Sequence, residues 1–499
     1  MAEENLLFYG SLMSSIGSIT LSYPILEPSG QLAEMSPFFK RLVDTFNSEV
    51  EVIGSIPSSA ASLLKQYVGT ARATLSDLVK ILPVYGQTAA FKAVQNVISN
   101  TMQDRLERVL SAPNYQNNTT KLKPEFISAL FGERLNVSIS QLESYYSNPF
   151  AYFLQYGLKL QERATNELNV AQTGTLYHAV FENVLHELIV KNKSLRDITG
   201  DELRALVRQH MQSQLALPAF EILNDSGKMR ATTNYLTRVC ETLVLNLQAA
   251  ARENTSKPEA VEQLFGFSKE SLPPLSFARM QVRGKLDRFD KQDVNGEFGT
   301  IIDYKSNGKT FNWGQAYDGL QMQLLTYWDA AQQSAEKLGV AAIGGAFFAK
   351  ISPEKTKITD KTDLNALFTG KLIPETFKYR GLFISEPAYV SALTTLEPQE
   401  KSAHYPVVLL KNGALGKIGV DAVDPDEFAL LLQRNRENII TAGDLILSGY
   451  FPIMPVEGGL TYSPYLDIIR FDRALGDAYK VQSPADKNTI IKLLKGGQD

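Results

Sequence analysis

Two short runs decide the fold of this 499-residue chain: Gly284-Lys285-Leu286-Asp287-Arg288 and Ile301-Ile302-Asp303-Tyr304-Lys305. The β-branched pair that precedes Asp303 favours a strand in the second run. Side chains two positions apart on a strand point to the same face. We therefore expect the carboxylate of Asp303 and the amine of Lys305 to share one surface of a sheet.

The first run lies in a segment that is also typical of a strand, Met280 to Phe289. The polar, glycine-containing connector from Asp290 to Gly299 would return the chain antiparallel beside it. This hairpin would bring Asp287 to the surface that carries Asp303.

Two carboxylates and one ammonium group suit metal-assisted cleavage of a phosphodiester bond. Carboxylate oxygens hold a hard cation such as Mg²⁺, and the cation neutralises a phosphate and lowers the pKa of a bound water. Lys305, as a point charge, can position that water or stabilise the charge that develops on phosphorus. The alternative is an exposed Asp/Lys pair on a hairpin, because a lone D-x-K occurs often by chance. The flanking segments must decide between the two.

Upstream of the hairpin, residues 173–190 predict a helix. Its His178, Glu182 and His186 recur every fourth residue and therefore stack on one helix face. Imidazole is a common metal ligand, whereas the simpler interpretation is a hydrogen-bonded helix histidine.

Downstream of the hairpin, Gly314 to Lys337 predicts a second helix. Gln323 and Tyr327 lie one turn apart on it. Taken alone they are typical of ordinary helix surface or packing. The occurrence of all these pieces in one order favours a functional site.

The charge of the chain limits how it can bind DNA. Its formal net charge is −4 and its sequence pI is near 5.8, whereas proteins that coat duplex DNA are usually basic. Any contact with DNA should therefore be a local channel. Cationic side chains crowd the hairpin and could line one: Arg283, Lys285, Arg288, Lys305 and Lys309. The alternative is a solvated face of mixed charge, because Asp290 and Asp293 lie among them.

Composition indicates an ordinary globular protein, with 44% hydrophobic and 21% charged residues, and the length suggests about three domains. The one cysteine, Cys240, excludes a disulfide scaffold and is typical of a small buried hydrophobe in a reducing cytoplasm. The chain begins with acidic residues and contains no run approaching the ~20 apolar residues of a membrane helix. We expect a cytoplasmic protein without a membrane anchor.

An ATPase site is not expected in this chain. Gly308-Lys309-Thr310 resembles the end of a Walker A motif, but the glycine required five positions earlier is Asp303. Without a loop that cradles phosphates, no helicase or ATPase activity is predicted here.

The pattern along the chain predicts two domains, 1–115 and 116–499, with a catalytic core at about 170–350. The first is mostly helical, with a strand from Ser18 to Ser22, and a polar linker from Asn114 to Lys121 follows it. Elements predicted in the second are a capping box of Ser140 with Glu143, mostly helices to Asn254, a strand from Ala341 to Ala349, an insertion over 351–400, a hairpin over 405–419, and a helix capped by Asp424 and Pro425 that ends near Gly449.

The order of these motifs resembles that of the RecB-type PD-(D/E)XK nuclease domain. The match is closer still to the C-terminal nuclease domain of AddB/RexB subunits of bacterial ATP-dependent helicase-nucleases. The shared elements are Gly174 with His178, the G-K-L-D-R and I-I-D-Y-K runs, and Q-x-x-x-Y from Gln323 to Tyr327, while residues 138–163 are similar to the start of that domain. The resemblance covers about Leu122 to Asp472 well and the first ~115 residues weakly.

The resemblance implies an α/β fold, in which helices flank a mixed central sheet, and a set of roles. Asp287 and Asp303 would bind Mg²⁺ with help from the Tyr304 carbonyl and His178. Lys305 would activate or orient water. Gln323 and Tyr327 would steady the lysine or the DNA backbone, and the remaining supporting residues would be Arg288 and Glu182.

The resemblance also implies a function. The chain would be a Mg²⁺-dependent single-strand exonuclease that degrades the strand ending 5′, within a heterodimer whose other, RexA/AddA-type subunit unwinds double-stranded DNA at breaks. Family members are much longer, so residues 1–115 would be the remnant of a helicase-like domain. Two alternatives remain: a nuclease-inactive scaffold that guides DNA, and a stand-alone repair or restriction endonuclease.

One departure concerns cysteines. AddB proteins hold a four-iron four-sulfur cluster with four cysteines, but the corresponding positions here are Asn148, Leu460, Ser463 and Ile469. None supplies a thiolate. The resemblance therefore implies the RexB branch without an iron-sulfur cluster, in which apolar packing of Leu460 and Ile469 replaces the metal.

Overall fold

The computed structural model divides the chain into two compact units, Met1–Tyr115 and Gln116–Asp499. It describes residues 2–26, 31–46, 50–52, 59, 62, 66–162, 170–268, 270–292, 297–306, 308–352, 377–416 and 421–496.

The first unit is helical in its described part. Its helices are α1 (Ala2–Met13), α2 (Pro37–Phe46), α4 (Ala71–Tyr85), α5 (Ala89–Ser111) and the short 3-10 helix η1 (Ala112–Asn114). Helices α4 and α5 pack on each other through a small core that includes Leu78, Ile81 and Phe91. The strand expected from Ser18 to Ser22 is absent from the described residues 2–26, because no neighbouring strand pairs with this exposed segment.

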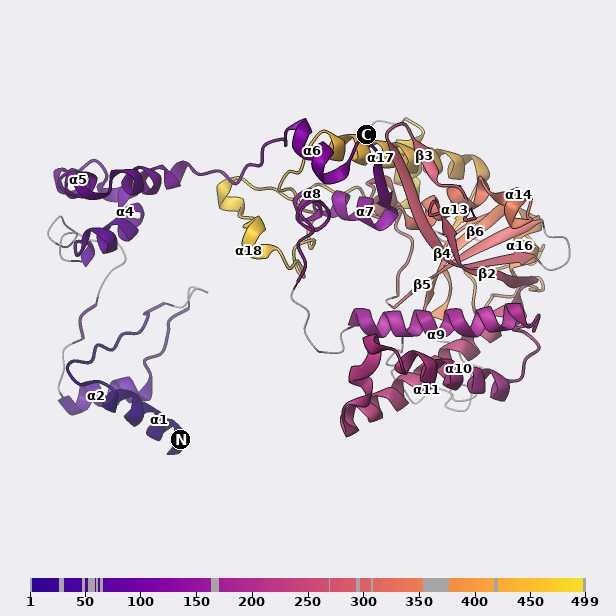
Figure 1. The fold of residues 1–499 in the computed structure, drawn as a ribbon, viewed down its shortest axis with the longest axis horizontal. Coiled ribbons are helices and arrows are strands. Elements are labelled where there is room, and N and C mark those ends of the chain that lie inside the picture. The colour runs from indigo at the N-terminus through magenta and orange to yellow at the C-terminus, as the bar shows by residue number, and fades with distance from the viewer. Residues whose placement is uncertain are drawn as a thin grey trace. The chain divides into compact units, whose positions relative to one another are not determined.

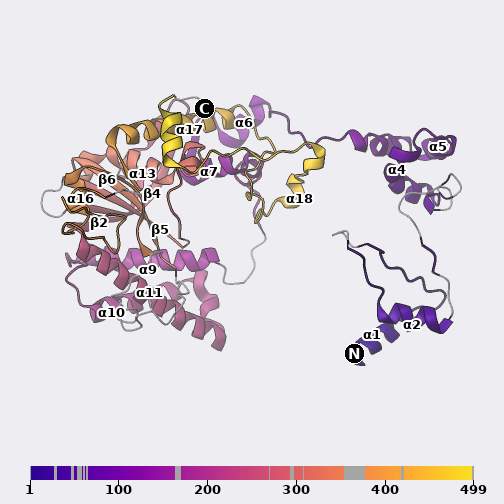
Figure 2. The same cartoon turned by 180° about the vertical axis from the view of Figure 1, so that it is seen from behind.

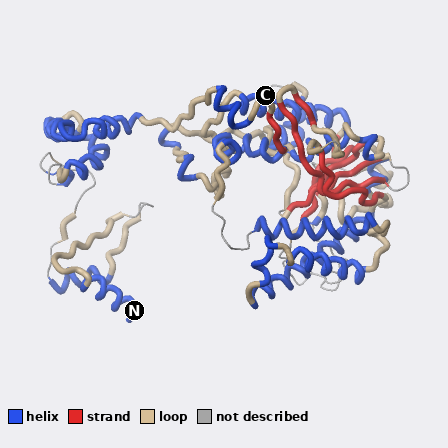
Figure 3. The backbone as a smooth tube through the Cα atoms, in the orientation of Figure 1, coloured by secondary structure: helices blue, strands red, loops and turns tan. Residues whose placement is uncertain are grey.

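Eight described strands of the second unit form one mixed sheet (Figures 1 and 3). They are β1 (Leu135–Ser138), β2 (Ser256–Phe265), β3 (Leu275–Phe277), β4 (Met280–Gln292), β5 (Phe298–Lys305), β6 (Ala342–Lys350), β7 (Arg380–Ile384) and β8 (Ala422–Val423). The order is β1-β4-β5-β6-β7-β8, and β2 and β3 also pair with the long strand β4. Strands β4 and β5 are antiparallel, whereas β5 and β6 are parallel.

Helices cover both faces of this sheet (Figures 1 and 2). One face carries α9 (Val170–Val190), α10 (Gly200–Leu215) and α11 (Gly227–Glu253), and the other carries α7 (Ile139–Ser147), α13 (Gln323–Gln332) and α17 (Pro425–Leu447). The remaining helices are α6 (Pro124–Phe131), α8 (Pro149–Tyr152), η2 (Phe153–Gly157), η3 (Pro218–Asn224), α12 (Trp313–Tyr317), α14 (Ala335–Leu338), α16 (Pro387–Leu393), α18 (Leu466–Ile469), η5 (Arg473–Leu475) and α19 (Lys487–Leu494). The α/β mixed fold predicted from the sequence is confirmed.

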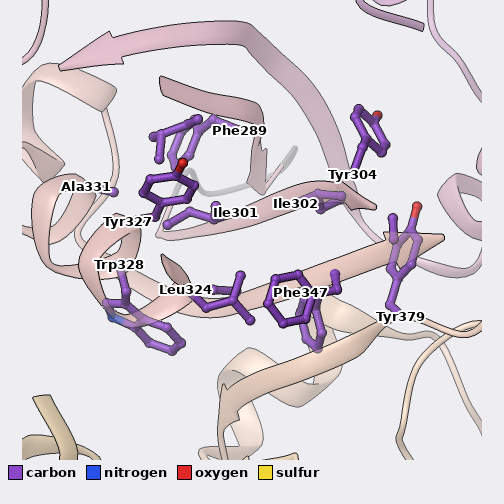
Figure 4. Packing of buried hydrophobic residues seen from close by; sticks show 14 of the residues in the cluster. Phe289, Ile301, Ile302, Tyr304, Leu324, Tyr327, Trp328, Ala331, Phe347 and Tyr379 are labelled. Atoms are coloured by element: carbon purple, nitrogen blue, oxygen red, sulfur yellow. The ribbon is translucent and has the colours of Figure 1, made fainter. Parts of the chain in front are cut away.

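The core of the second unit lies between the hairpin β4/β5 and helix α13 (Figure 4). Phe289 and Ile301 are cross-strand partners, and both pack in one buried cluster with Leu324 and Trp328 of the helix. Burying each such side chain contributes roughly 1.5–3 kcal/mol, so the hairpin that carries the acidic residues is held firmly.

Strand β4 is longer than the sequence predicts. The expected connector began at Asp290, yet this residue lies inside the strand, where it pairs with Thr300 of β5. Its carboxylate is buried in an ion pair with Arg288. A charged residue can therefore continue the strand, because its partner neutralises it. Residues 293–296 lie outside the described part.

Helix α7 begins earlier than expected. The predicted capping box of Ser140 with Glu143 is wrong, since Ser138 caps the helix and Gln141 completes the box. The carboxylate of Glu143 is used elsewhere.

The single helix predicted from Gly314 to Lys337 is wrong, because it divides into α12, α13 and α14. Gly319 has φ 79°, and a Cβ at this position would lie 2.7 Å from the ring of Tyr146. This break lets α13 begin at Gln323. The prediction failed because the close approach of Tyr146 comes from a distant part of the chain.

The predicted strand from Ala341 to Ala349 is present as β6, and Asp424 and Pro425 begin α17 as expected. The predicted hairpin over 405–419 is reduced to isolated bridges, with 417–420 outside the described residues. Within the predicted insertion over 351–400, residues 353–376 are also outside, and β7 and α16 follow.

Candidate active site

The hairpin places the two aspartates of the predicted site together. The backbone amide of Tyr304 donates a hydrogen bond to Oδ2 of Asp287 over 2.8 Å, at the end of β5 where Asp303 lies one residue away. The side chain of Asp287 is 13% exposed and that of Asp303 is 1% exposed. The strands thus hold two carboxylates side by side with little water around them.

This arrangement is electrostatically unfavourable for the carboxylates alone. Burial raises the pKa of Asp287, although the charges of Lys305 and Lys285 oppose the shift. Burial and the charge of Asp287 raise the pKa of Asp303 from 3.8 to about 6. Two close carboxylates that cannot both ionise easily form a strong site for a cation.

Lys305 supplies positive charge at this point. Its Nζ lies 2.5 Å from Oδ2 of Asp303, and the side chain remains 24% exposed. The ammonium group also lies 5.7 Å from the ring centre of Phe348. The structure therefore brings Asp287, Asp303 and Lys305 together, as the alternation of the strand predicts.

Helix α13 fixes the orientation of Asp303. Gln323 Nε2 donates to Oδ1 of Asp303 over 2.9 Å and to the hydroxyl of Tyr327 over 3.0 Å. Tyr327 is buried. In this structure the contact of Gln323 is with the carboxylate of Asp303, and Tyr327 accepts a hydrogen bond from Gln323.

Glu143 is a member of the site that sequence reasoning missed. Its Oε1 accepts hydrogen bonds from the backbone amides of Met322 (2.6 Å) and Gln323 (2.9 Å). A carboxylate at a helix N-terminus satisfies free amides and interacts favourably with the helix dipole. Burial raises the pKa of Glu143. Because Glu143 holds the end of α13, it positions Gln323 against Asp303.

No sequence signal could have assigned this role to Glu143, because its partners follow it by 179 and 180 residues. The local pattern instead favoured a capping role within its own helix.

His178 lies beside the carboxylates on helix α9. Its Nδ1 is 3.6 Å from Oδ2 of Asp287, and its ring meets that of Tyr304 edge-on at 5.9 Å. Burial lowers the pKa of His178, so the imidazole is neutral near pH 7, as a metal ligand must be. The Tyr304 ring is buried, which leaves its backbone as the part that can take part in the site.

Glu182 lies one turn further along α9, and its charge contributes to the raised pKa of Asp287. The third residue of the predicted stack, His186, is exposed on that helix.

Arg288 does not line a DNA channel, which corrects the prediction. It is 1% exposed, and its guanidinium makes two hydrogen bonds of 2.6 Å to the carboxylate of Asp290. The side chain points into the protein because successive residues of a strand alternate between faces. Arg288 therefore supports the sheet from inside.

The other cations are accessible. Arg283 and Lys285 are both exposed on β4, and Lys285 forms an ion pair with Glu262 of β2. Lys309 is half-buried, with Nζ 5.1 Å from the ring centre of Phe348.

Asp287 and Asp303 are the residues of this site that could hold a divalent metal ion. The described residues contain no group of three or more His, Cys, Asp or Glu side chains arranged to hold one, so the carboxylate pair is the candidate. Mg²⁺ is commonly held by one or two carboxylates, with water and substrate phosphate as the other ligands. Asp287 and Asp303 meet that requirement.

The region of the missing cysteines is held by apolar contacts. Ile469 is fully buried in a small cluster with Leu154 and Tyr465, against which Leu460 packs. Asn148 caps α8, since its Oδ1 accepts from the amide of Ala151 over 3.1 Å. The C-terminal segment thus contacts the start of the domain by packing.

Hydrogen bonds strengthen the same junction. The amide of Val456 donates to the carbonyl of Ser147 over 2.8 Å, and the hydroxyl of Tyr465 donates to the carbonyl of Leu160 over 2.9 Å.

Cys240 is buried in α11, as predicted. None of the helices in the described residues has the length and apolar character needed to cross a bilayer.

A mixed sheet whose central hairpin joins two aspartates and a lysine indicates a nuclease. Residues 136–461 match the PD-(D/E)XK nuclease superfamily, and the chain belongs to it.

Relatives with a narrower name cover the whole chain. The B subunit of the ATP-dependent helicase/deoxyribonuclease of Leuconostoc citreum (strain KM20) is 57% identical over 505 residues, which cover 100% of this chain and 43% of that protein. Proteins of the same name from Oenococcus oeni and Pediococcus pentosaceus are 35% and 27% identical; the matches cover 99% and 100% of this chain and 44% of each relative. The chain spans less than half the length of these relatives. The resemblance to B subunits is confirmed.

Proposed function

We propose that this chain is the nuclease module of a helicase-nuclease B subunit and hydrolyses phosphodiester bonds of single-stranded DNA with Mg²⁺. The observation that carries the proposal is the buried pair Asp287 and Asp303, with Lys305 in contact with one of them. Such a concentration of charge costs stability unless a ligand uses it.

Asp287 and Asp303 would hold the metal, with the Tyr304 carbonyl and His178 as further donors. When bound, Mg²⁺ supplies charge that neutralises the phosphate and lowers the pKa of a water. In this structure the ammonium of Lys305 contacts Oδ2 of Asp303, an oxygen that would bind the metal. We propose that its ammonium turns toward the attacking water or the phosphate, while Gln323 keeps Oδ1 of Asp303 in place.

The polarity of the degraded strand, the partner subunit and the cellular role are proposed from the resemblance and from the names of the relatives. The strand degraded would be the one ending 5′, a RexA/AddA-type partner would supply unwinding of double-stranded DNA, and the complex would act in the cytoplasm during repair of double-strand breaks. Residues 1–115 would be the end of a helicase-like domain.

The first test combines the chain, within its full-length subunit, with the partner helicase whose own nuclease is inactivated. Asp303→Ala and Lys305→Ala should each abolish Mg²⁺-dependent degradation of a 5′-labelled strand and leave unwinding intact, because they remove a ligand and a charge but no core packing. Lys337→Ala, on an exposed helix end, is the matched control. Degradation by the variants at the wild-type rate would show that cleavage does not depend on Asp303 and Lys305, whereas no degradation by the wild-type chain would leave a DNA-guiding scaffold as the function.

A further inference from the structure

A prominent aromatic side chain outside the site lies on the surface near β4. Phe267 retains 51% of its surface exposed, and the guanidinium of Arg283 lies 5.2 Å from its ring centre. A cation over an exposed aromatic ring has a flat apolar surface and a positive charge in one place.

The backbone holds this pair together. Gly266 has φ 77°, and a Cβ there would lie 2.9 Å from Cβ of Arg283. Only glycine readily permits this conformation and this approach. The hydroxyl of Ser271 then accepts hydrogen bonds from the amides of Phe267 (3.2 Å) and Ser268 (3.1 Å). The exposed ring is therefore held in place by a defined turn.

The pair is continuous with the proposed active site along β4. Val282 and Leu286 are buried, whereas Arg283 and Lys285 are accessible, so the two cations share the outward face of the strand. Lys285 is close enough to influence Asp287 and His178, because its charge lowers the pKa of both groups.

We propose that Phe267 and Arg283 form a binding subsite for single-stranded DNA, in which a base stacks on the Phe267 ring and Arg283 contacts a phosphate. This inference rests on the proposed nuclease function and extends it from the reacting phosphate to the path of the strand. Arg283 and Asp287 are four residues apart on a strand, roughly 13 Å. At ~3.4 Å per stacked base, this is about four nucleotides, and fewer if the DNA is extended.

Charge favours DNA over a protein as the occupant. Arg283 and Lys285 precede the site on β4, and Lys305 and Lys309 follow it beside Phe348. Glu262 offsets part of the charge of Lys285, so Arg283 is the stronger of the two anchors. An exposed aromatic ring beside cations that follow the strand is the common arrangement for binding a single strand without sequence preference.

The test measures binding separately from cleavage. In an Asp303→Ala background with EDTA, fluorescence anisotropy of labelled oligo-dT should show that Phe267→Ala and Phe267→Leu weaken binding by roughly 5- to 150-fold, the range for loss of one stacked base. Phe267→Trp should restore it. Arg283→Ala should weaken binding and reduce its dependence on salt.

Tyr235→Ala and Arg238→Ala on α11 are matched controls, because they remove an exposed ring and an exposed cation away from β4. They should bind like the background protein. If Phe267→Ala also binds like it, or weakens only the association with the partner helicase, the subsite is overturned. If Phe267→Ala weakens DNA binding but the wild-type chain does not cleave DNA, the proposed subsite is retained and the proposed nuclease function is rejected.

Discussion

Asp303 lies in an environment that disfavours its negative charge. It is almost fully buried, faces a second carboxylate, and is held by the side-chain amide of Gln323 on one oxygen and the ammonium of Lys305 on the other. Its raised pKa means that folding alone favours the protonated form. A cation bound as proposed above would favour the charged form of Asp303.

The stability of the metal-free protein should reflect this environment of Asp303. Between pH 3.8 and about 6 the folded protein keeps the proton of Asp303 that the unfolded chain has lost, so its stability should fall as pH rises through this range. Asp303→Asn should raise the free energy of unfolding at pH 7.5, on the order of 3 kcal/mol. Chemical denaturation without metal measures this, and the gain should shrink toward pH 4. A variant less stable than wild type at pH 7.5 would contradict the assignment.

Glu143 should act through Gln323 rather than on the substrate. Glu143→Ala leaves two amides of α13 without an acceptor, and we expect kcat to fall roughly 10- to 100-fold. Glu143→Gln retains a carbonyl oxygen and should recover most of the activity. Ser144→Ala on the same helix serves as the control. If the Gln and Ala variants lose activity equally, the negative charge of Glu143 matters more than its position.

His178 provides a separate test of the metal site. If it is a ligand, His178→Ala should weaken the apparent affinity for Mg²⁺ by roughly 10- to 100-fold, with an unchanged melting temperature. A Mg²⁺ titration of nuclease activity measures the effect. Titration like wild type would assign a structural role to the histidine.

At the scale of elements, the sequence predicts what depends on local periodicity. The alternation around Asp303 and Lys305 and the helix that carries His178 are both present, and Asp287 lies where the hairpin was expected to bring it. The break before Gln323 was not predictable, because it depends on contact between Gly319 and the ring of Tyr146. Long-range packing overrides local helix propensity in such cases.

The same distinction explains the errors at single residues. Arg288 was counted among the cations near the site, although the alternation of β4 places it on the face opposite Asp287. The sequence does not show that this opposite face is buried at Arg288. Its partner Asp290 appeared as a turn residue. Each assignment fails because the two residues neutralise each other inside the protein.

At the scale of the whole nuclease unit, its first and last segments depend on each other. The apolar contact of Ile469 with Leu154, and the hydrogen bond from Tyr465 to Leu160, join segments that lie far apart in the sequence. Iron would be the alternative means of joining them, and the four relevant positions here offer no thiolate.

Because of this junction, we expect substitutions at the neighbouring residues Ile469 and Ile468 to differ strongly in their effect on stability. Ile469→Asp buries an unpaired charge and should lower the free energy of unfolding by roughly 3 kcal/mol or more, and Leu460→Asp should add to the loss. Ile468→Asp is the control, because Ile468 is 51% exposed. Thermal melting compares the variants. Equal melting of the Ile468 and Ile469 variants would show that the junction does not stabilise the unit.

The contact between Glu143 and α13 also determines when the site can form during translation. Translation proceeds from the N-terminus, and Glu143 emerges 180 residues before Gln323, which it must hold. A nascent chain that already exposes helix α7 thus lacks a complete site, since neither aspartate nor the amide that orients Asp303 has yet been made. The site can therefore form only after Gln323 has been synthesised. The segment that carries Tyr465 and Ile469 follows later and packs against the start of the nuclease unit.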